Sequence, residues 1–326
     1  MQLRAVGPFE VSAIGLGCMS LSHGYGPPPE RKVAETVLLG ALDAGYNFLD
    51  TAHVYGLGHN ETLIGEVLSH RRADYVLASK CGVSIGSKRD LDGRPERLKA
   101  ACEESLTRLR TDVIDLYYLH RWDKRIPIEE SVGGLAELVA EGKIKAIGLS
   151  EVSADTLRRA HATHPIAALQ TEYSLWTRNP EIAVLSACRE LGVTFVAFSP
   201  VGRGFLAGGG HDPAALADSD MRRMMPRFQG DALQANLRLY GAFAGLAAEA
   251  GCTPAQLCLA WLLQKDPSLV PIPGTTNPDH MRENMAAAGM SVPADLANRL
   301  ETLLNAETVT GERYNPMMQA AVDTEQ

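Results

Sequence analysis

Four ionisable side chains stand where three short β-prone segments of this 326-residue chain end. Asp50 closes the first segment and Tyr55 follows shortly after it, whereas Lys80 and His120 close the second and the third. If these segments are neighbouring parallel strands, the four groups meet at one edge of the sheet, where a parallel barrel carries its active site. A carboxylate, a phenol, an ammonium and an imidazole held together can perform proton chemistry.

Tyr55 is the candidate proton donor to a carbonyl oxygen. A phenol with a reference pKa of ~10 is a poor acid at neutral pH unless a cation favours the phenolate, and Lys80 can be that cation. Asp50 would orient the ammonium, and His120 would hydrogen-bond the substrate oxygen. The alternative is that these residues have only structural roles, with Tyr55 as a loop aromatic, Lys80 as a solvated strand end and Asp50 as a helix cap. It accounts well for each residue taken alone and poorly for all four at successive strand ends.

The segments that would position these groups alternate between strand and helix. Eight apolar segments predict strands, at residues 13–18, 47–50, 76–80, 115–119, 146–149, 168–171, 193–198 and 269–273. Helical periodicity marks residues 30–44, 61–68, 95–109, 128–140, 153–162, 180–191 and 277–288. Eight βα units close a parallel barrel. We therefore predict an α/β fold, a (β/α)8 TIM barrel that forms one domain over residues 1–326.

Several segments are predicted to be additions to the barrel. Residues 3–12 predict a β-hairpin that caps one of its ends. The insertion between residues 200 and 251 is too long for an ordinary βα loop and is expected to shape the site. The polar tail at about 308–326 either drapes over the site or is disordered. Extra helices are expected over residues 232–250 and 293–304.

Composition excludes several classes of protein. With 45% hydrophobic and 21% charged residues the chain can bury a large core. A net charge of -8 argues against nucleic acid or an anionic membrane as partner. No apolar run approaches the ~18 residues that span a bilayer, so a cytoplasmic protein is expected. The six cysteines lack paired spacing, which indicates buried thiols, and no metal site is expected because zinc-like spacings are missing.

A glycine-containing turn after one predicted strand is a candidate cofactor contact. Phe198 ends the strand and can stack on a flat ring. The turn contains Ser199, Gly202 and Arg203, so backbone N–H groups and a guanidinium can reach a pyrophosphate. The alternative is an ordinary loop beside a core phenylalanine.

A second candidate phosphate site follows the last predicted strand. Asn277 and Pro278 are a typical cap and first residue of a helix, so the helix N-terminus would face the loop at residues 272–276. By contrast, Gly15 and Gly17 do not indicate a dinucleotide-binding fold. The third glycine and the immediate helix of that fingerprint are missing.

Four stretches of sequence resemble the signatures of a known family. They are residues 47–56, 115–120, 142–150 and 272–275, the last together with Glu283-Asn284. On these stretches the chain resembles an aldo-keto reductase from Ile14 to about Ala288. The resemblance implies a (β/α)8 barrel that binds NADPH in extended form and reduces aldehydes or ketones.

The resemblance also implies roles for individual residues. The catalytic tetrad is matched by Asp50, Tyr55, Lys80 and His120, with Tyr55 as general acid. The cofactor contacts are matched by Ser150, Gln170, Phe198, Ser199, Gly202, Arg203, Gly274, Thr275, His280, Glu283 and Asn284. Three departures stand out: Glu151 replaces a common Asn, His280 a common Arg, and Gly274 and Thr276 occupy positions where relatives often carry a Lys for the 2′-phosphate.

The expected function is reduction of small-molecule aldehydes or ketones to alcohols, with NADPH/NADP+ as cofactor. The alternative is a catalytically weak regulatory or sensor protein that binds the cofactor on the same barrel, and the intact tetrad favours the enzyme. Nucleic acid and membrane are not expected partners, and the sequence leaves the physiological substrate and the oligomeric state open. An apolar substrate pocket is expected to be lined by Met19, Tyr25, Trp122, Trp176 and residues 221–228.

Overall fold

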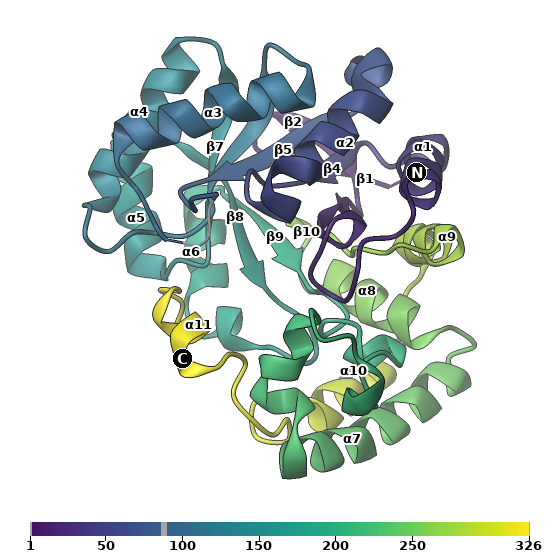
Figure 1. Ribbon diagram of the computed structural model, residues 1–326. Coiled ribbons are helices and arrows are strands. Elements are labelled where there is room, and N and C mark those ends of the chain that lie inside the picture. The colour runs from purple at the N-terminus through teal and green to yellow at the C-terminus, as the bar shows by residue number, and fades with distance from the viewer. Residues whose placement is uncertain (1, 86–89, 326) are drawn as a thin grey trace.

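The computed structural model describes residues 2–85 and 90–325, in which eight parallel strands pair in sequence order (Figure 1). The predicted (β/α)8 fold is confirmed, because helices alternate with these strands and surround them. The strands are β3 (Leu16–Gly17), β4 (Phe48–Asp50), β5 (Val76–Cys81), β6 (Ile114–Leu119), β7 (Ile144–Ser150), β8 (Ile166–Glu172), β9 (Thr194–Phe198) and β10 (Leu269–Pro271).

Backbone contacts between the first and last strand segments close the barrel. The amides of Gly15 and Gly17 donate hydrogen bonds to the carbonyl oxygens of Pro271 and Pro273, at 3.0 and 3.1 Å. The two segments approach so closely that a Cβ atom on Gly17 would lie 2.7 Å from the carbonyl oxygen of Ile272. These glycines therefore serve barrel closure, which explains why they lack the rest of a dinucleotide fingerprint.

The helices of the barrel agree with the predicted ranges in most units. They are α1 (Arg31–Asp43), α2 (His59–Leu68), α3 (Pro95–Leu109), α4 (Ile128–Ala140), α5 (Ala154–Thr163), α6 (Val184–Leu191), α8 (Pro254–Lys265) and α9 (Pro278–Ala286). The helix predicted over residues 180–191 is divided, because Ala183 adopts a non-helical conformation at φ −150°. Helix α8 was not predicted, although Thr253 and Gln256 form a capping box that marks its start.

The predicted hairpin caps the N-terminal end of the barrel. Strands β1 (Leu3–Val6) and β2 (Phe9–Ser12) pair antiparallel. Val6 and Val11 are fully buried in the same cluster as the barrel-interior residues Phe48 and Leu116. The guanidinium of Arg4 donates to the carbonyl oxygen of Asp266 at 2.7 Å, which ties the hairpin to the segment before β10.

The predicted extra helices are also present. Figure 1 shows α7 (Gly230–Glu249) and α10 (Ala294–Leu303) together on one side of the barrel, and the yellow C-terminal chain leading from them to α11 (Pro316–Ala320). The Asp323 amide donates to the carbonyl oxygen of Glu151, at the end of β7, at 2.9 Å. Of the two outcomes predicted for the tail, the structure therefore adopts the draped one.

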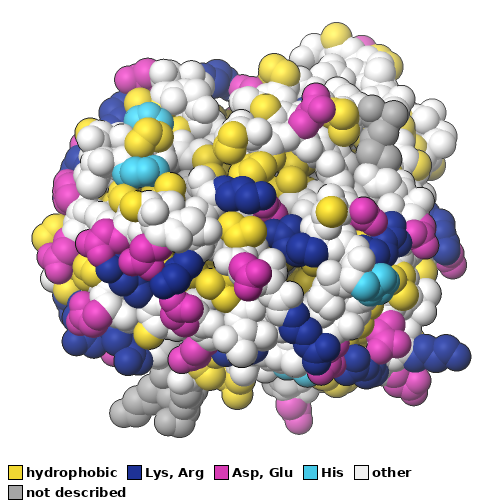
Figure 2. Space-filling model, turned by 90° about the horizontal axis from the view of Figure 1, so that it is seen from above, with side chains coloured by type: hydrophobic (Ala, Val, Ile, Leu, Met, Phe, Trp, Pro, Cys, Tyr) yellow, Lys and Arg dark blue, Asp and Glu magenta, His cyan; other side chains and the backbone are white. Residues whose placement is uncertain are grey.

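The exposed surface carries charges of both signs. Figure 2 shows acidic and basic side chains interspersed on the face it presents. Arg159 and Glu129, for example, form an exposed ion pair at 2.8 Å, and such pairs contribute about 0–1 kcal/mol each. Among the described residues no single helix is long and apolar enough to cross a membrane; α7 and α8 would pass only as a pair, across a bend of 81°.

A buried histidine, His53, lies in the loop between β4 and Tyr55. Arg108 Nη2 donates to His53 Nδ1 at 2.6 Å, and Arg108 Nε donates to Glu61 Oε2 at 2.9 Å. Because Nδ1 accepts a hydrogen bond, His53 is neutral with its proton on Nε2, which lies 3.7 Å from the exposed carboxylate of Glu104. Burial and the Arg108 charge lower the pKa of His53 to about 4.

This histidine predicts a pH dependence of stability. The unfolded chain, with a His pKa of about 6.5, takes up the proton before the folded one, so neutral His53 contributes stability above pH 6.5 that is lost as pH falls toward 4. The contribution amounts to at most about 3 kcal/mol. His53→Asn keeps an acceptor for Arg108 and should flatten the free energy of unfolding across this window, as measured by urea unfolding between pH 4 and pH 7.

The exposed His70 offers a matched control. His70→Asn should retain the pH dependence of the wild type. If His53→Asn and the wild type lose stability in parallel as the pH falls, another group is responsible.

Candidate active site

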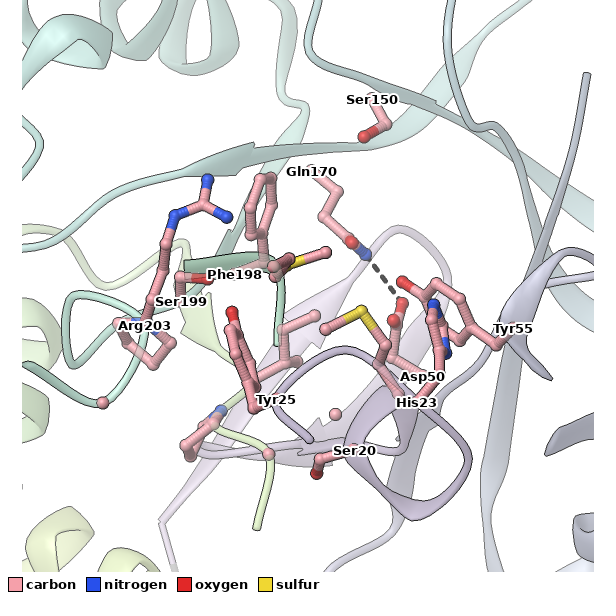
Figure 3. Close-up of a pocket in the computed structure, with 18 of the residues that line it drawn as sticks. Ser20, His23, Tyr25, Asp50, Tyr55, Ser150, Gln170, Phe198, Ser199 and Arg203 are labelled. Carbon is pink, nitrogen blue, oxygen red and sulfur yellow. Dashed lines mark hydrogen bonds between the residues drawn. The ribbon is translucent and has the colours of Figure 1, made fainter. Parts of the chain in front are cut away.

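A buried ion pair forms the base of the site at the carboxyl ends of the strands. Asp50 and Lys80 are 2% and 1% exposed. Lys80 Nζ donates to Asp50 Oδ1 at 2.5 Å, to the Thr51 carbonyl oxygen at 2.8 Å and to Tyr55 Oη at 3.3 Å. Gln170 Nε2 donates to the other carboxylate oxygen of Asp50 at 2.7 Å, the dashed line in Figure 3. Both carboxylate oxygens are thereby satisfied.

The phenol and the imidazole lie above this pair. Tyr55 begins the 3-10 helix Tyr55–Gly58 directly after the β4 loop. The His120 amide donates to the Cys81 carbonyl oxygen at 2.9 Å, which fixes its position just beyond β6. The rings of Tyr55 and His120 meet edge to face, with centroids 5.8 Å apart and an interplanar angle of 82°. The structure thus brings together all four residues that the sequence proposed.

Burial sets the protonation of the phenol. It raises the pKa of Tyr55, and the neighbouring Lys80 charge lowers that pKa by less, so the net shift is upward. The expected influence of Lys80 is present but does not prevail. Burial also lowers the pKa of Lys80, yet the Asp50 carboxylate and the Tyr55 phenol outweigh it, so this pKa is raised. Both groups therefore hold their protons at neutral pH.

A cavity of about 330 Å³ opens above the ion pair. Figure 3 shows Tyr55 and Arg203 on opposite sides of it. The predicted cofactor residues that line it are Ser150, Gln170, Phe198, Ser199, Arg203 and Gly274. The others, which do not line it, are Gly202, Thr275, His280, Glu283 and Asn284.

The walls of the cavity agree only in part with the predicted substrate pocket. Met19, Tyr25 and Met221 line it as predicted. The prediction for Trp122 and Trp176 is wrong. Trp176 is 2% exposed and packs on Phe205 with ring centroids 4.3 Å apart. Trp122 lies outside the lining and donates its indole N–H to the carbonyl oxygen of Ile126 at 2.8 Å. Arg222, within the predicted range 221–228, also lines the cavity, whereas His23, Arg121, Tyr314 and Met318 are lining residues that the prediction missed.

Three non-glycine residues near the cavity adopt the left-handed backbone conformation. Glu151, Ser199 and Arg203 have φ angles of 56°, 49° and 59°. Such residues carry local strain of about 1–3 kcal/mol each and are held in place by their surroundings. The Arg203 guanidinium is buried in an ion pair with Glu172, with Nε 3.3 Å from Oε1. Its assignment to a pyrophosphate stays a prediction.

A second buried cluster, which we call the C-terminal latch, consists of Glu151, Glu172, Arg203, Arg313 and Tyr314. Arg313 donates from Nη1 and Nη2 to the two carboxylate oxygens of Glu151, at 3.0 and 2.6 Å. The Tyr314 ring lies 4.7 Å from the Arg203 guanidinium and 4.5 Å from that of Arg313. Burial raises the pKa of Glu151, but the charges of Arg313 and Arg121 and the hydrogen bonds from Arg313 and the Glu172 amide together outweigh it, so the net shift is downward. Glu151 thus departs from the common Asn because it binds the tail.

The residues predicted to contact the adenosine end lie in α9 and just before it. Asn277 caps this helix by accepting from the Asp279 amide at 2.8 Å, and Thr275 Oγ1 accepts from the Asn277 amide at 3.0 Å. Asp279 also forms an exposed ion pair with Arg282 at 2.9 Å. Glu283 accepts from the Thr253 hydroxyl and is thereby tied to α8. A carboxylate in the first turn partly offsets the positive helix end.

Comparison with known proteins identifies the class of this barrel. Residues 13–305 match the model of the Aldo/keto reductase family. The chain is 43% identical over 311 residues to probable aldo-keto reductase 1 of Glycine max, covering 94% of this chain and 90% of that relative. The chain therefore belongs to the aldo/keto reductase family, whose members are oxidoreductases that act on carbonyl compounds.

Solved structures agree with this assignment. The glycerol dehydrogenase from Gluconobacter oxydans superposes with a TM-score of 0.85 at 27% identity, covering 96% of this chain and 98% of that one. An aldo/keto reductase from Klebsiella pneumoniae, solved in complex with NADP and acetate, gives a TM-score of 0.70 at 26% identity, covering 94% and 95%.

The latch predicts a large cost of losing one partner. Arg313→Met leaves the Glu151 carboxylate buried without its guanidinium, so the free energy of unfolding should fall by about 3–5 kcal/mol. The double variant Glu151→Gln with Arg313→Met should recover part of that loss, because the uncompensated charge is gone. Urea unfolding of the wild type and the three variants completes the cycle.

Arg299, which pairs with Glu249 on the surface at 2.7 Å, serves as the control. Arg299→Met should cost less than about 1 kcal/mol. An Arg313→Met protein as stable as Arg299→Met would show that the latch does not stabilise the fold.

Proposed function

We propose that this protein reduces aldehyde or ketone groups of small molecules to alcohols, with NADPH as hydride donor and Tyr55 as general acid. The observation that carries the proposal is the continuous hydrogen-bonded series Gln170, Asp50, Lys80 and Tyr55 at the base of the cavity. Membership of the family supports the reaction class. The ordered series favours an enzyme over a cofactor-binding sensor, because a sensor has no need of a buried, oriented acid.

The cavity offers contacts for the nicotinamide and pyrophosphate parts of a dinucleotide. Phe198 offers an aromatic face at the end of β9, and Ser150 and Gln170 offer polar groups at the same end of the cavity as Tyr55. Ser199 and Arg203 lie toward the other end, where a pyrophosphate would find a hydroxyl and a guanidinium. NADPH bound in this way supplies the hydride, and the solved Klebsiella relative is an NADP complex.

The hydrogen-bond directions assign the proton. Tyr55 Oη accepts from Lys80 Nζ, so its own O–H is left to donate to a substrate oxygen in the cavity. Bound NADPH would supply the hydride to the carbonyl carbon, and Tyr55 would give its proton to the carbonyl oxygen, which yields the alcohol. The Lys80 ammonium then stabilises the phenolate, while Asp50 keeps that ammonium in place. His120, edge-on to Tyr55, is positioned to hydrogen-bond the same oxygen.

Removing the acid should separate binding from turnover. Tyr55→Phe keeps the ring but loses the proton, so kcat for 4-nitrobenzaldehyde should fall at least ~100-fold. Lys80→Met should do similar damage by leaving the phenolate unstabilised. Turnover is followed by the loss of NADPH absorbance, and NADPH binding to each variant by protein fluorescence.

Tyr240 lies outside the cavity and provides the matched control. Tyr240→Phe should retain wild-type turnover. Unchanged turnover in Tyr55→Phe would assign the acid to another group. If the same variant no longer binds NADPH, the fall in rate reflects lost cofactor binding and does not support Tyr55 as the acid.

The protein should prefer NADPH to NADH by a modest factor. The N-terminus of α9 and the hydroxyls of Thr275 and Thr276 favour a 2′-phosphate, whereas the Asp279 carboxylate in the first turn opposes it and a Lys is missing at Gly274 and Thr276. We expect NADPH to bind more tightly than NADH by a factor that narrows as salt is raised. Fluorescence titrations with both cofactors at two ionic strengths measure this.

Thr276→Lys adds the missing cation in the same place. It should widen the preference by about tenfold or more, the size of a charge-assisted hydrogen bond. Equal dissociation constants for the two cofactors in the wild type would show that this helix end does not recognise the 2′-phosphate.

A further inference from the structure

The arginines that line the cavity differ in how their charge is compensated. Arg203 forms its buried ion pair with Glu172. Arg222 pairs with Asp220 at 2.7 Å. Arg121, the third lining arginine, forms no ion pair with any residue in the described ranges 2–85 and 90–325. Arg203 and Arg222 thus have carboxylate partners, whereas Arg121 has none among these residues.

The hydrogen bonds of Arg121 use only part of its guanidinium. Nη1 donates to the carbonyl oxygen of His120 at 2.6 Å and to Ser150 Oγ at 3.1 Å. Both acceptors are neutral. No hydrogen bond from Nε or Nη2 to a described side chain or carbonyl is formed, and neither atom is sealed inside the protein. A guanidinium carries five N–H donors, so one edge of this side chain stays available to a ligand.

The charge of the cavity is consequently unbalanced by one unit. Its other lining residues with permanent charge are Asp50, Arg203 and Arg222, and each has an ion-pair partner. The Arg121 charge also reaches the Glu151 carboxylate and lowers its pKa, but both oxygens of that carboxylate accept hydrogen bonds from Arg313, so Arg121 has no ion-pair partner of its own among the described residues. This single positive charge matches a monoanion, and a planar guanidinium suits a carboxylate through paired N–H donors. A phosphate dianion would leave one negative charge without a partner.

Arg121 lies at the reacting end of the cavity. It follows His120 directly and donates to the His120 carbonyl oxygen, and the His120 ring lies edge-on to Tyr55. The pyrophosphate end is therefore not its place. Its charge also reaches the phenol: it is among the influences that lower the pKa of Tyr55, although burial, the largest influence, raises that pKa.

We propose that Arg121 binds a carboxylate of the substrate, so that the preferred substrates are oxo acids and carboxyl-bearing aldehydes. This inference rests on the proposed carbonyl reduction and adds a substrate class to it. The carbonyl oxygen takes its place at Tyr55 and His120, and the carboxylate of the same molecule pairs with the free edge of Arg121. A neutral substrate leaves that edge to water and gains nothing from the residue.

The test compares charged and neutral substrates of nearly the same shape. The 2-, 3- and 4-carboxybenzaldehydes are each paired with the nitrobenzaldehyde substituted at the same position, and kcat/KM is measured with NADPH. In Arg121→Gln, kcat/KM for the best carboxybenzaldehyde should fall about 10- to 100-fold, the size of a charge-assisted hydrogen bond, and that for its nitro partner less than about threefold. Comparing each substrate between proteins removes differences in intrinsic reactivity.

Two variants make the comparison specific. Arg121→Lys keeps the charge without the planar fork and should recover part of the carboxylate preference. Arg158→Gln removes an exposed guanidinium that pairs with Glu190 on the surface, and it should leave kcat/KM unchanged for both substrates. In the wild type, raised salt should lower kcat/KM for the carboxybenzaldehyde more than for the nitro compound. This last measurement needs no variant to fold.

Each contrary outcome has a distinct meaning. If Arg121→Gln lowers kcat/KM equally for both substrates, the proposed carboxylate site is overturned. Arg121 then supports either the loop or cofactor binding, and titration of the variant with NADPH distinguishes these two roles. If the wild type shows no salt-sensitive preference for any carboxyl isomer, the inference also fails while carbonyl reduction stands. If the wild type reduces none of the six aldehydes with NADPH, the proposed function itself fails.

Discussion

The buried ammonium of Lys80 is the constraint on which the site depends. An isolated ammonium in that position would lose its proton or its place, because burial penalises the charged form. Asp50 prevents this, and it does so from the neighbouring strand. The parallel register that pairs Asp50 with Ala78 brings the carboxylate within 2.5 Å of the Lys80 amine. Since side chains alternate along a strand, a slip of one residue would turn Lys80 away from the cavity.

The tetrad could be predicted from sequence because it follows from local signals and one rule of topology. Asp50, Lys80 and His120 stand at the ends of recognisable β-prone segments, Tyr55 follows Asp50 closely, and the carboxyl ends of parallel strands meet. Trp176 was misplaced for the opposite reason. An aromatic residue after a strand suits a pocket wall and a core equally well, and only its contact with Phe205 decides between them. Helix α8 was missed although its capping box was visible.

The C-terminal latch lay beyond such reasoning. Glu151 and Arg313 are 162 residues apart, and nothing in either local sequence points to the other. A polar tail without periodicity looks the same whether it is free or docked. The tail is nevertheless part of the site, because Tyr314 and Met318 line the cavity. Because Tyr314 lies against Arg203, the tail covers the Arg203 side of the cavity, and excluding water there strengthens the electrostatic interactions inside.

The charges around the cavity then divide into two kinds. Asp50 with Lys80, Glu172 with Arg203 and Glu151 with Arg313 are buried pairs in which both partners belong to the protein. They hold Tyr55 and the walls of the cavity in place, and they do not discriminate between one carbonyl substrate and another. Arg121 has no such partner among the described residues, so its interaction free energy depends on what enters. Reactivity and selectivity therefore reside in different side chains of one cavity, and a change at Arg121 can alter the second without disturbing the ion pair that supports the first.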